Sequence, residues 1–390
     1  MKITAEVADT LRRAISRERL IDTAVRLVEV PSPTGAAGPA ADRLAEILTA
    51  DGFLVERPVA NWPAAPAVVA RFDSGRPGRV LQFNGHLDTV HLPFVPPRVA
   101  DGKLSGSGAV DMKGGIAAMV EAARVLRETR LLSAGSLLMT AHDLHEAPWG
   151  DNHQLEALID AGFIGDAVLI PEYFRDCLPT VGRGLAILRV VIRREGDPVH
   201  EVLGGIDRPN VIAAGAELVA LLTQLDARVA LRSHPLAGRE SVFIGRMASG
   251  EIYNQSPVQC EVEGTRRWLP GTEFRDVQAE LQAIFDSVAR KFGTTVDARL
   301  DVVRPAFEMA ADNPLVAPFQ QAISSVRGRS LPLGAKPFVD DGNTFVTRGK
   351  IPAITFGPGG RGAHTLQEEV PVSGLEETSL IYALAAMGFC

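Results

Sequence analysis

Cysteine is scarce in this chain, so thiols can supply neither a disulfide framework nor a metal cluster. The 390 residues include three cysteines, Cys177, Cys260 and Cys390. Their odd number and wide separation exclude a set of paired disulfides and a zinc site built from thiolates. Any metal bound here must therefore be held by histidine, aspartate or glutamate side chains.

Positive charge is not in surplus either, because 40 lysines and arginines face 47 aspartates and glutamates, a net charge of -7. Nucleic acids and anionic membranes attract basic surfaces, so we expect neither as a partner and favour a small-molecule substrate. The sequence has no apolar run long enough to span a bilayer and no signal peptide at its start, which makes the cytoplasm the expected location.

The length and the 46% hydrophobic content predict two domains with large cores. Residues 1–55 read as two amphipathic helices, and buried strands alternating with helices follow to about residue 179. Between residues 180 and 303 the order becomes strand, helix, strand, strand, helix, strand, which predicts an inserted α/β sandwich of the ferredoxin-like type. The first pattern returns over residues 304–390, so segments 1–179 and 304–390 should form one α/β domain.

A histidine and an aspartate directly follow a buried strand at residues 79–83. Because side chains two positions apart on a strand point to the same side, His86 and Asp88 can act together. A neutral imidazole is a good zinc ligand, and a nearby carboxylate can orient it. A strand-end histidine that is simply hydrogen-bonded to a carboxylate is the favoured explanation of this pair when it is taken alone.

Ligand-type residues also follow the other predicted strands of the first domain. The strand at 135–140 leads to His142, Asp143, His145 and Glu146, the strand at 166–170 leads to Glu172, and the strand at 353–357 leads to a glycine loop with His364. Asp111 precedes a helix in a glycine-rich segment, where an N-cap role is the alternative. Ligands bind where the carboxyl ends of α/β strands converge, so the sequence predicts a metal site there.

The order and spacing of these motifs resemble the zinc metallopeptidase and deacylase family that contains acetylornithine deacetylase, succinyl-diaminopimelate desuccinylase, aminoacylase and glutamate carboxypeptidase. The resemblance covers nearly the whole chain. It is carried by GHLDTV at 85–90, GSGAVDMKGG at 106–115, DAVLIPE ending at Glu172 and GPGGRGAHTLQEEV at 357–370. It implies a zinc-peptidase-like mixed sheet flanked by helices, with the insert as a lid or dimerisation domain.

The resemblance also implies two divalent metal ions, zinc first and cobalt or manganese as alternatives. Asp111 would bridge them, with His86 and Glu172 on one ion and Glu146 and His364 on the other. Asp88 would orient His86.

The loop at residues 143–146 departs from the pattern of the family. The family has Asp-Glu-Glu, in which the first glutamate is the general base and the second is a ligand. Here Leu144, His145 and Glu146 follow Asp143. Counting back from the helix near residue 155 makes Glu146 the ligand and His145 the base, which an imidazole can be. A shift by one residue would make Glu146 the base instead.

Three residues of the insert also resemble family positions. His200 resembles a histidine that reaches into the site of the partner subunit and stabilises an oxyanion, which implies a homodimer formed through the insert. Arg267 resembles an arginine that binds a substrate carboxylate. Asn254 also resembles a family position and is expected to bind substrate, with a turn residue as the equal alternative. Arg266, next to Arg267, is expected to be a solvated strand residue.

The expected function is hydrolysis of the amide bond of an N-acyl amino acid or a short peptide by a metal-activated water. A dipeptidase or aminopeptidase acting on free N-termini is one alternative. Because the loop at 143–146 is altered, a catalytically impaired homologue that binds a metal or an amino acid is another.

Overall fold

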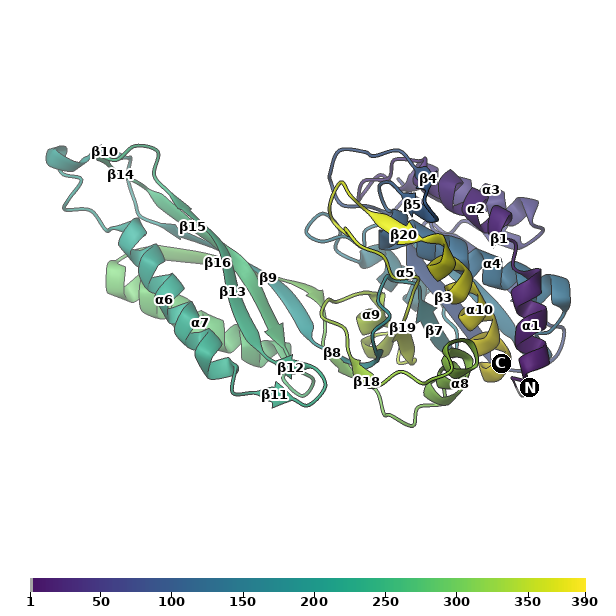
Figure 1. Cartoon of the computed structure of the whole chain (residues 1–390). Helices are drawn as coiled ribbons and strands as arrows, with labels where there is room; N and C mark the ends of the chain where they lie inside the picture. The colour runs from purple at the N-terminus through teal and green to yellow at the C-terminus, as the bar shows by residue number, and fades with distance from the viewer. Residues whose placement is uncertain (1–2) are drawn as a thin grey trace. The chain divides into compact units, whose positions relative to one another are not determined.

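The computed structural model describes residues 3–390 and divides them into two compact units (Figure 1). The first unit contains the chain up to Thr180, Met309–Lys336 and Asp340–Cys390, and the second contains Val181–Glu308 with Pro337–Val339. The sequence pattern predicted an insert over residues 180–303. The role of the insert as a lid or dimerisation domain stays a prediction.

The first unit is built on a six-stranded mixed sheet in the order β1-β2-β6-β3-β7-β19. The strands β6, β3, β7 and β19 run parallel to one another, and β2 and β1 are antiparallel additions at one edge. The bounds are β1 (Leu54–Glu56), β2 (Val68–Asp73), β3 (Val80–His86), β6 (Ser136–His142), β7 (Ala167–Ile170) and β19 (Ala353–Thr355). The four parallel strands are almost entirely buried because helices cover both faces of the sheet.

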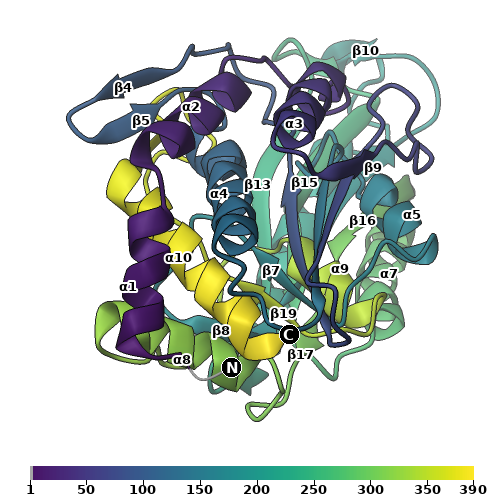
Figure 2. The same cartoon turned by 90° about the vertical axis from the view of Figure 1, so that its right-hand side faces the viewer.

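In Figures 1 and 2, α4 and α10 lie on one face of this sheet, and α5 and α9 lie on the other. The helices of the unit are α1 (Ala5–Ala14), α2 (Arg17–Val28), α3 (Gly38–Ala50), α4 (Gly114–Thr129), α5 (His153–Asp160), α8 (Val316–Arg327), α9 (Asp341–Thr347) and α10 (Val372–Phe389). Among residues 3–390, no helix combines the length and the apolar character needed to cross a membrane.

The N-terminal region contains three helices, so the expectation of two was wrong. The missed helix is α1, whose Thr4 side chain accepts a hydrogen bond from the Val7 backbone. It buries only Ala8 and Leu11, and so short an apolar stripe gives a weak periodic signal.

Two small sheets complete this part of the chain. The strands β4 (Arg98–Ala100), β5 (Lys103–Ser105) and β20 (Glu369–Pro371) form one of them, next to the short irregular helix at Ala109–Lys113. The strands β8 (Leu178–Gly182), β17 (Phe307–Glu308) and β18 (Leu333–Ala335) form the other, where the chain passes from one unit to the next.

The second unit is a ferredoxin-like sandwich, as its element order predicted. The antiparallel sheet has the order β13-β15-β9-β16, and the two long helices pack on it around a separate hydrophobic core. Its main elements are β9 (Gly184–Arg193), α6 (Val211–Val229), β13 (Ser241–Ser249), β15 (Gln259–Trp268), α7 (Phe274–Phe292) and β16 (Thr295–Arg304). Short hairpin strands are β10 (Val199–His200) with β14 (Gln255–Ser256), and β11 (Ser233–His234) with β12 (Gly238–Arg239).

Arg266 is fully buried, so the expectation of a solvated strand residue was wrong. Its guanidinium pairs with Glu240, whose side chain is also fully buried. Glu240 additionally accepts a hydrogen bond of 2.7 Å from the Thr272 hydroxyl and lies 3.2 Å from Arg232. A buried arginine of this kind cannot be recognised from the strand pattern, because its partner is 26 residues away in sequence.

Replacing Arg266 by methionine should leave the Glu240 carboxylate buried without its main partner. Breaking one side of a buried ion pair costs about 3–5 kcal/mol, so we expect a loss of that order in denaturant unfolding followed by circular dichroism. The control is Arg246→Met, which removes an exposed arginine that pairs with Glu261 and Glu263 on the same sheet. Equal stability of the two variants would contradict this account of the buried pair.

Candidate metal centre

The four parallel strands of the first unit bring acidic and histidine side chains to one edge of the sheet. The strand β3 ends at His86 and the neighbouring strand β6 at His142, which pairs with His86 in the register of the two strands. On the other side of β3, β7 ends two residues before Glu172. Because the strands are parallel, their carboxyl ends meet at the same edge, so the residues that follow them lie together.

Asp111 lies between two histidines that are far apart in the sequence. One of its carboxylate oxygens, Oδ1, is 3.2 Å from Nε2 of His86, and the other, Oδ2, is 3.2 Å from Nε2 of His364. The side chains of His86 and Asp111 are almost completely buried, whereas His364 is about half exposed. A single carboxylate therefore faces two imidazole nitrogens, one with each oxygen.

Each of these histidines also has a glutamate beside it. The Glu172 Oε1 atom lies 3.5 Å from Nε2 of His86, and the Glu146 Oε2 atom lies 3.2 Å from Nε2 of His364. The Glu172 Oε2 atom is buried and has no hydrogen-bond partner among residues 3–390. A buried carboxylate oxygen without a donor is costly unless a cation approaches it.

Two glycines allow the backbone to close around Glu172. A Cβ atom on Gly115, at the start of α4, would lie 2.0 Å from the carbonyl oxygen of Pro171. A Cβ atom on Gly357, just after β19, would lie 2.0 Å from the carbonyl oxygen of Glu172. Because glycine has no Cβ atom, Gly115 and Gly357 allow the backbone segments that position Glu172 to approach each other closely.

Asp88 supports the site mainly through the following loop. The His86 Nδ1 atom is 3.0 Å from the Asp88 backbone carbonyl and 3.6 Å from its carboxylate. The Asp88 carboxylate itself accepts hydrogen bonds from the backbone N–H groups of His145, at 3.1 Å, and Glu146, at 3.0 Å. Asp88 thus fixes the altered loop as well as the orientation of the His86 ring.

His145 stacks on His86, with ring centroids 3.9 Å apart and planes 5° from parallel. Its Nε2 atom is 3.8 Å from Oε1 of Glu172, and its Nδ1 atom is 2.7 Å from Oδ1 of Asp341. Asp341 was not among the site residues predicted from the sequence. The signal that could have found it is the Asp-Asp-Gly-Asn run at residues 340–343, which begins α9.

The His142 and Asp143 side chains order the loop rather than face the centre. The Asp143 carboxylate accepts backbone N–H groups of Gly35 at 2.9 Å and Ala37 at 3.0 Å. The His142 Nε2 atom is 2.8 Å from Oδ2 of Asp341.

The buried charges of the centre shift one another's pKa values. Burial by itself lowers the pKa of His86, but hydrogen bonds to Asp111 and Glu172 raise it well above its usual range. The neighbouring carboxylates Asp111 and Glu146 raise the pKa of His364 to about 10. Burial, together with the charge of Asp111, raises the pKa of Glu172. In each case the neighbouring carboxylates favour the protonated form of the group.

The residues of the insert named in the sequence analysis lie in the second unit. The Asn254 side-chain nitrogen is 3.0 Å from Nε2 of His200, so these two residues contact each other. Arg267 lies on β15, and its Nη1 atom is buried without a hydrogen-bond partner among the described residues. Burial and the neighbouring charge of Arg183 lower the pKa of Arg267.

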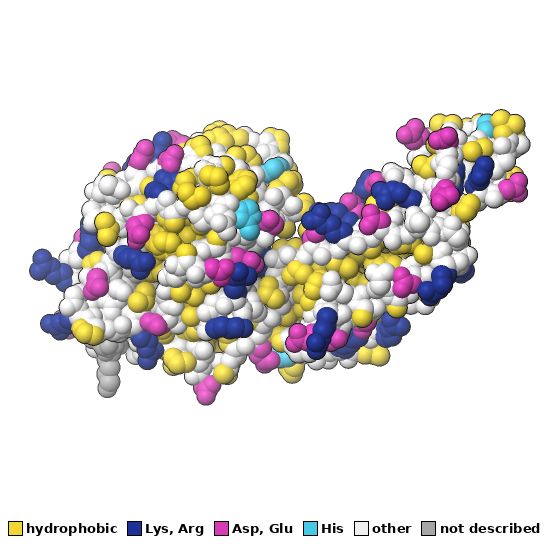
Figure 3. Space-filling view, turned by 180° about the vertical axis from the view of Figure 1, so that it is seen from behind, with side chains coloured by type: hydrophobic (Ala, Val, Ile, Leu, Met, Phe, Trp, Pro, Cys, Tyr) yellow, Lys and Arg dark blue, Asp and Glu magenta, His cyan; other side chains and the backbone are white. Residues whose placement is uncertain are grey.

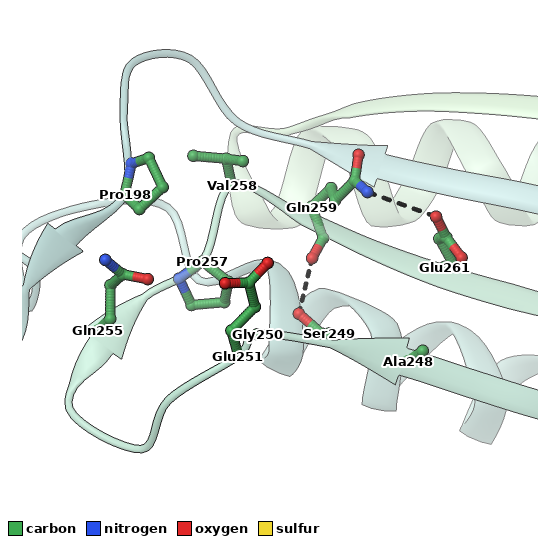
Figure 4. A pocket seen from close by; sticks show the side chains of 10 residues that line it. All are labelled: Pro198, Ala248, Ser249, Gly250, Glu251, Gln255, Pro257, Val258, Gln259 and Glu261. Atoms are coloured by element: carbon green, nitrogen blue, oxygen red, sulfur yellow. Dashed lines mark hydrogen bonds between the residues drawn. The ribbon is translucent and has the colours of Figure 1, made fainter.

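The second unit contains a separate pocket of about 320 Å³ whose lining differs from that of the metal centre. Figure 4 shows Ser249, Gln259 and Glu261 along it, with the Gln259 amide donating to Glu261 at 3.3 Å. None of its ten lining residues is a histidine. Both groups of metal-ligand type found among residues 3–390 lie in the first unit.

The donor set fits a pair of divalent cations. His86, Asp111 and Glu146 form one group and His86, His145 and Glu172 another, and within each group the ligand atoms lie within 4.8 Å of one another. Nitrogen and carboxylate donors at this spacing suit zinc, cobalt or manganese, and the orphaned oxygen of Glu172 fits a ligand role. The fold and the site together define a metal-dependent hydrolase with an inserted sandwich.

The family is shown by sequence comparison. Peptidase family M20/M25/M40 matches residues 82–388, and the chain belongs to this family. It is 28% identical over 378 residues to a succinyl-diaminopimelate desuccinylase of Methylorubrum extorquens, covering 91% of this chain and 95% of that protein. It is 30% identical over 387 residues to the enzyme of the same name from Methylobacterium nodulans, covering 91% and 92%. The chain is thus a metal-dependent hydrolase of amide bonds.

Solved structures share its fold. Aminopeptidase PepT from Bacillus cereus superposes with a TM-score of 0.79 at 21% identity, over 96% of this chain and 99% of that one. The YXEP protein of Bacillus subtilis, a dinuclear metal-binding peptidase of the M20 family, gives a TM-score of 0.69 at 18% identity, over 95% and 97%. The expected fold class and family are therefore confirmed.

Changing Asp88 to asparagine should weaken metal binding without unfolding the protein. An amide of the same shape offers one acceptor oxygen in place of two, so the loop that carries Glu146 loses support. Loss of such a supporting contact typically lowers metal affinity by about 10–100-fold, which competition with a chromogenic chelator would measure. The control is Asp151→Asn, in an exposed loop next to His153. Unchanged affinity in Asp88→Asn would refute the supporting role.

Proposed function

We propose that this protein uses two zinc ions to release an amino acid from an N-acyl amino acid or a short peptide that carries a carboxylate next to the scissile amide. The observation that carries the proposal is Asp111, which lies between His86 and His364, each with its own glutamate. The curated relatives named above as desuccinylases favour an acylated amino acid over a free peptide.

The ligand assignment follows these distances. His86 and Glu172 would hold one ion, Glu146 and His364 the other, and Asp111 would be shared. When bound, the two ions polarise the scissile carbonyl and lower the pKa of a water molecule. Zinc is the first choice, and cobalt and manganese are the alternatives for the same donor set.

His145 is the proposed general base. It would take a proton from the attacking water at Nε2 and pass it to the leaving amine. The other register of the loop, with Glu146 as the base, is disfavoured because the Glu146 carboxylate is already 3.2 Å from His364. Asp88 contributes by holding the backbone of both loop residues.

Arg267 is the proposed site for the substrate carboxylate. Asn254, which contacts His200, is proposed to reach the substrate together with that histidine. A buried guanidinium nitrogen without a partner, close to a second arginine, Arg183, favours binding of an anion. A planar fork of donors suits a carboxylate.

We further propose a homodimer formed through the insert. Five large hydrophobic side chains near His200 are more than half exposed, namely Val202, Leu203, Ile206, Ile252 and Tyr253. Figure 3 shows hydrophobic side chains together with a histidine at the end of this unit. Exposed apolar groups so close to one another are typical of an interaction surface, and a partner subunit seated there would bring in His200.

The test of the proposed function is amine release from a panel of N-succinyl, N-acetyl and N-aromatic amino acids and of dipeptides. We expect release that requires added zinc or cobalt, stops with a chelator and resumes when metal is returned. Preference for N-acylated substrates would support a deacylase function. Cleavage of dipeptides alone would instead support a dipeptidase function. Metal binding without any release would favour the catalytically impaired homologue.

The role of His200 across subunits has its own test. Changing His200 to alanine should lower turnover while the metal content stays the same, because the residue is expected to act on the oxyanion. Mixing this variant with Asp111→Ala, which lacks a metal ligand, should restore activity, because a mixed dimer then contains one complete site. The absence of recovery after verified subunit exchange, or loss of metal from His200→Ala, would contradict this role.

A further inference from the structure

The Asp341 carboxylate lies directly behind the proposed base. Asp341 is the first residue of α9 and is completely buried. Its Oδ1 atom is 2.7 Å from Nδ1 of His145. Its Oδ2 atom lies 2.8 Å from Nε2 of His142 and accepts a hydrogen bond of 2.8 Å from the Asn84 amide. Three side chains from two strands and a loop thus fix one carboxylate.

This contact determines which nitrogen of His145 carries hydrogen. An ionised carboxylate only accepts hydrogen bonds, so the Nδ1 atom of His145 must be the donor. The neutral ring then has its lone pair at Nε2, on the side that faces Glu172 at 3.8 Å. The stacking of the ring on His86 holds its plane in place.

The position of Asp341 is itself fixed by the start of α9. The side chain of the preceding residue, Asp340, accepts a hydrogen bond of 2.7 Å from the Gly342 backbone and caps the helix. Asp340 is held in turn by Lys336 and by the Thr355 hydroxyl, at 2.7 Å. The aspartate behind His145 is therefore rigid, which a positioning group requires.

We propose that Asp341 is a positioning residue that makes His145 an effective base in place of a glutamate. Its hydrogen bond fixes the tautomer protonated at Nδ1, which leaves the lone pair of Nε2 available to take a proton from water. The inference rests on the proposed role of His145. A histidine base requires a partner that fixes which ring nitrogen carries the hydrogen, whereas a glutamate base does not.

The alternative role for this pair is metal binding. One of the two groups of metal-ligand type consists of His86, His145 and Glu172. If His145 binds a metal ion, Asp341 orients a metal ligand and not a base. The two roles predict opposite results for metal content, which decides between them.

The experiment is a double-mutant cycle of His145→Glu and Asp341→Asn, with zinc stoichiometry and steady-state kinetics measured on every variant. In the natural background we expect Asp341→Asn to lower kcat by about 100-fold or more, with KM and bound zinc nearly unchanged. In the His145→Glu background the same change removes a like charge beside the new carboxylate, so kcat should stay the same or rise. The control for loss of a paired carboxylate outside the metal centre is Asp51→Asn, whose partly buried side chain is paired with Arg124 on α4.

A second readout does not depend on activity. In the metal-free protein, 15N-histidine NMR should show His145 protonated at Nδ1, and Asp341→Asn should change this tautomer. An equal loss of kcat in both backgrounds, or an unchanged tautomer, would overturn the positioning role. Loss of zinc in Asp341→Asn would assign His145 to metal binding instead.

The failure of this inference is distinguishable from failure of the proposed base. Full activity in His145→Ala would remove His145 from the mechanism altogether. Loss of activity in His145→Ala combined with normal activity in Asp341→Asn would keep His145 as the base and remove only Asp341.

Discussion

The carboxylate of Asp111, facing one histidine with each oxygen, is the group around which the other residues of the metal centre are arranged. His86 comes from the end of β3 and His364 from a loop beyond β19, 278 positions later in the sequence, and Asp111 lies between them. The backbone N–H of Asp111 in turn donates to Glu368, at 3.4 Å. Parallel strands deliver the other ligands to the same edge of the sheet, and glycines let the backbone close around Glu172.

Burying so many carboxylates together has a cost that protons or cations must offset. Histidines neutralise part of the cluster in the structure, as the raised pKa values of His86 and His364 indicate. Divalent cations would neutralise it more completely, so metal binding and stability of this edge of the sheet are linked. The pair of His145 and Asp341 extends the same principle, because a buried aspartate is tolerated where imidazoles and an amide surround it.

The sequence predicted the parallel strands and the convergence of their carboxyl ends, because buried strands have strong apolar runs that end on ligand-type residues. It also predicted the ferredoxin-like order of the insert. It did not reveal Asp341, which does not directly follow a strand and whose role depends on its contact with His145. Arg266 was misjudged for the same reason: its burial depends on Glu240, and strand periodicity carries no information about that partner. Long-range polar contacts are decided by tertiary structure, and local patterns do not contain them.

The central claim is that two metal ions share Asp111, and paramagnetic resonance of the cobalt-loaded protein tests it most directly. Spectra would be recorded after one and after two equivalents of cobalt have been bound. The account predicts two equivalents and, on addition of the second, loss or broadening of the first signal, because ions bridged by one carboxylate are magnetically coupled. Binding of a single equivalent, or two signals that simply add, would contradict it.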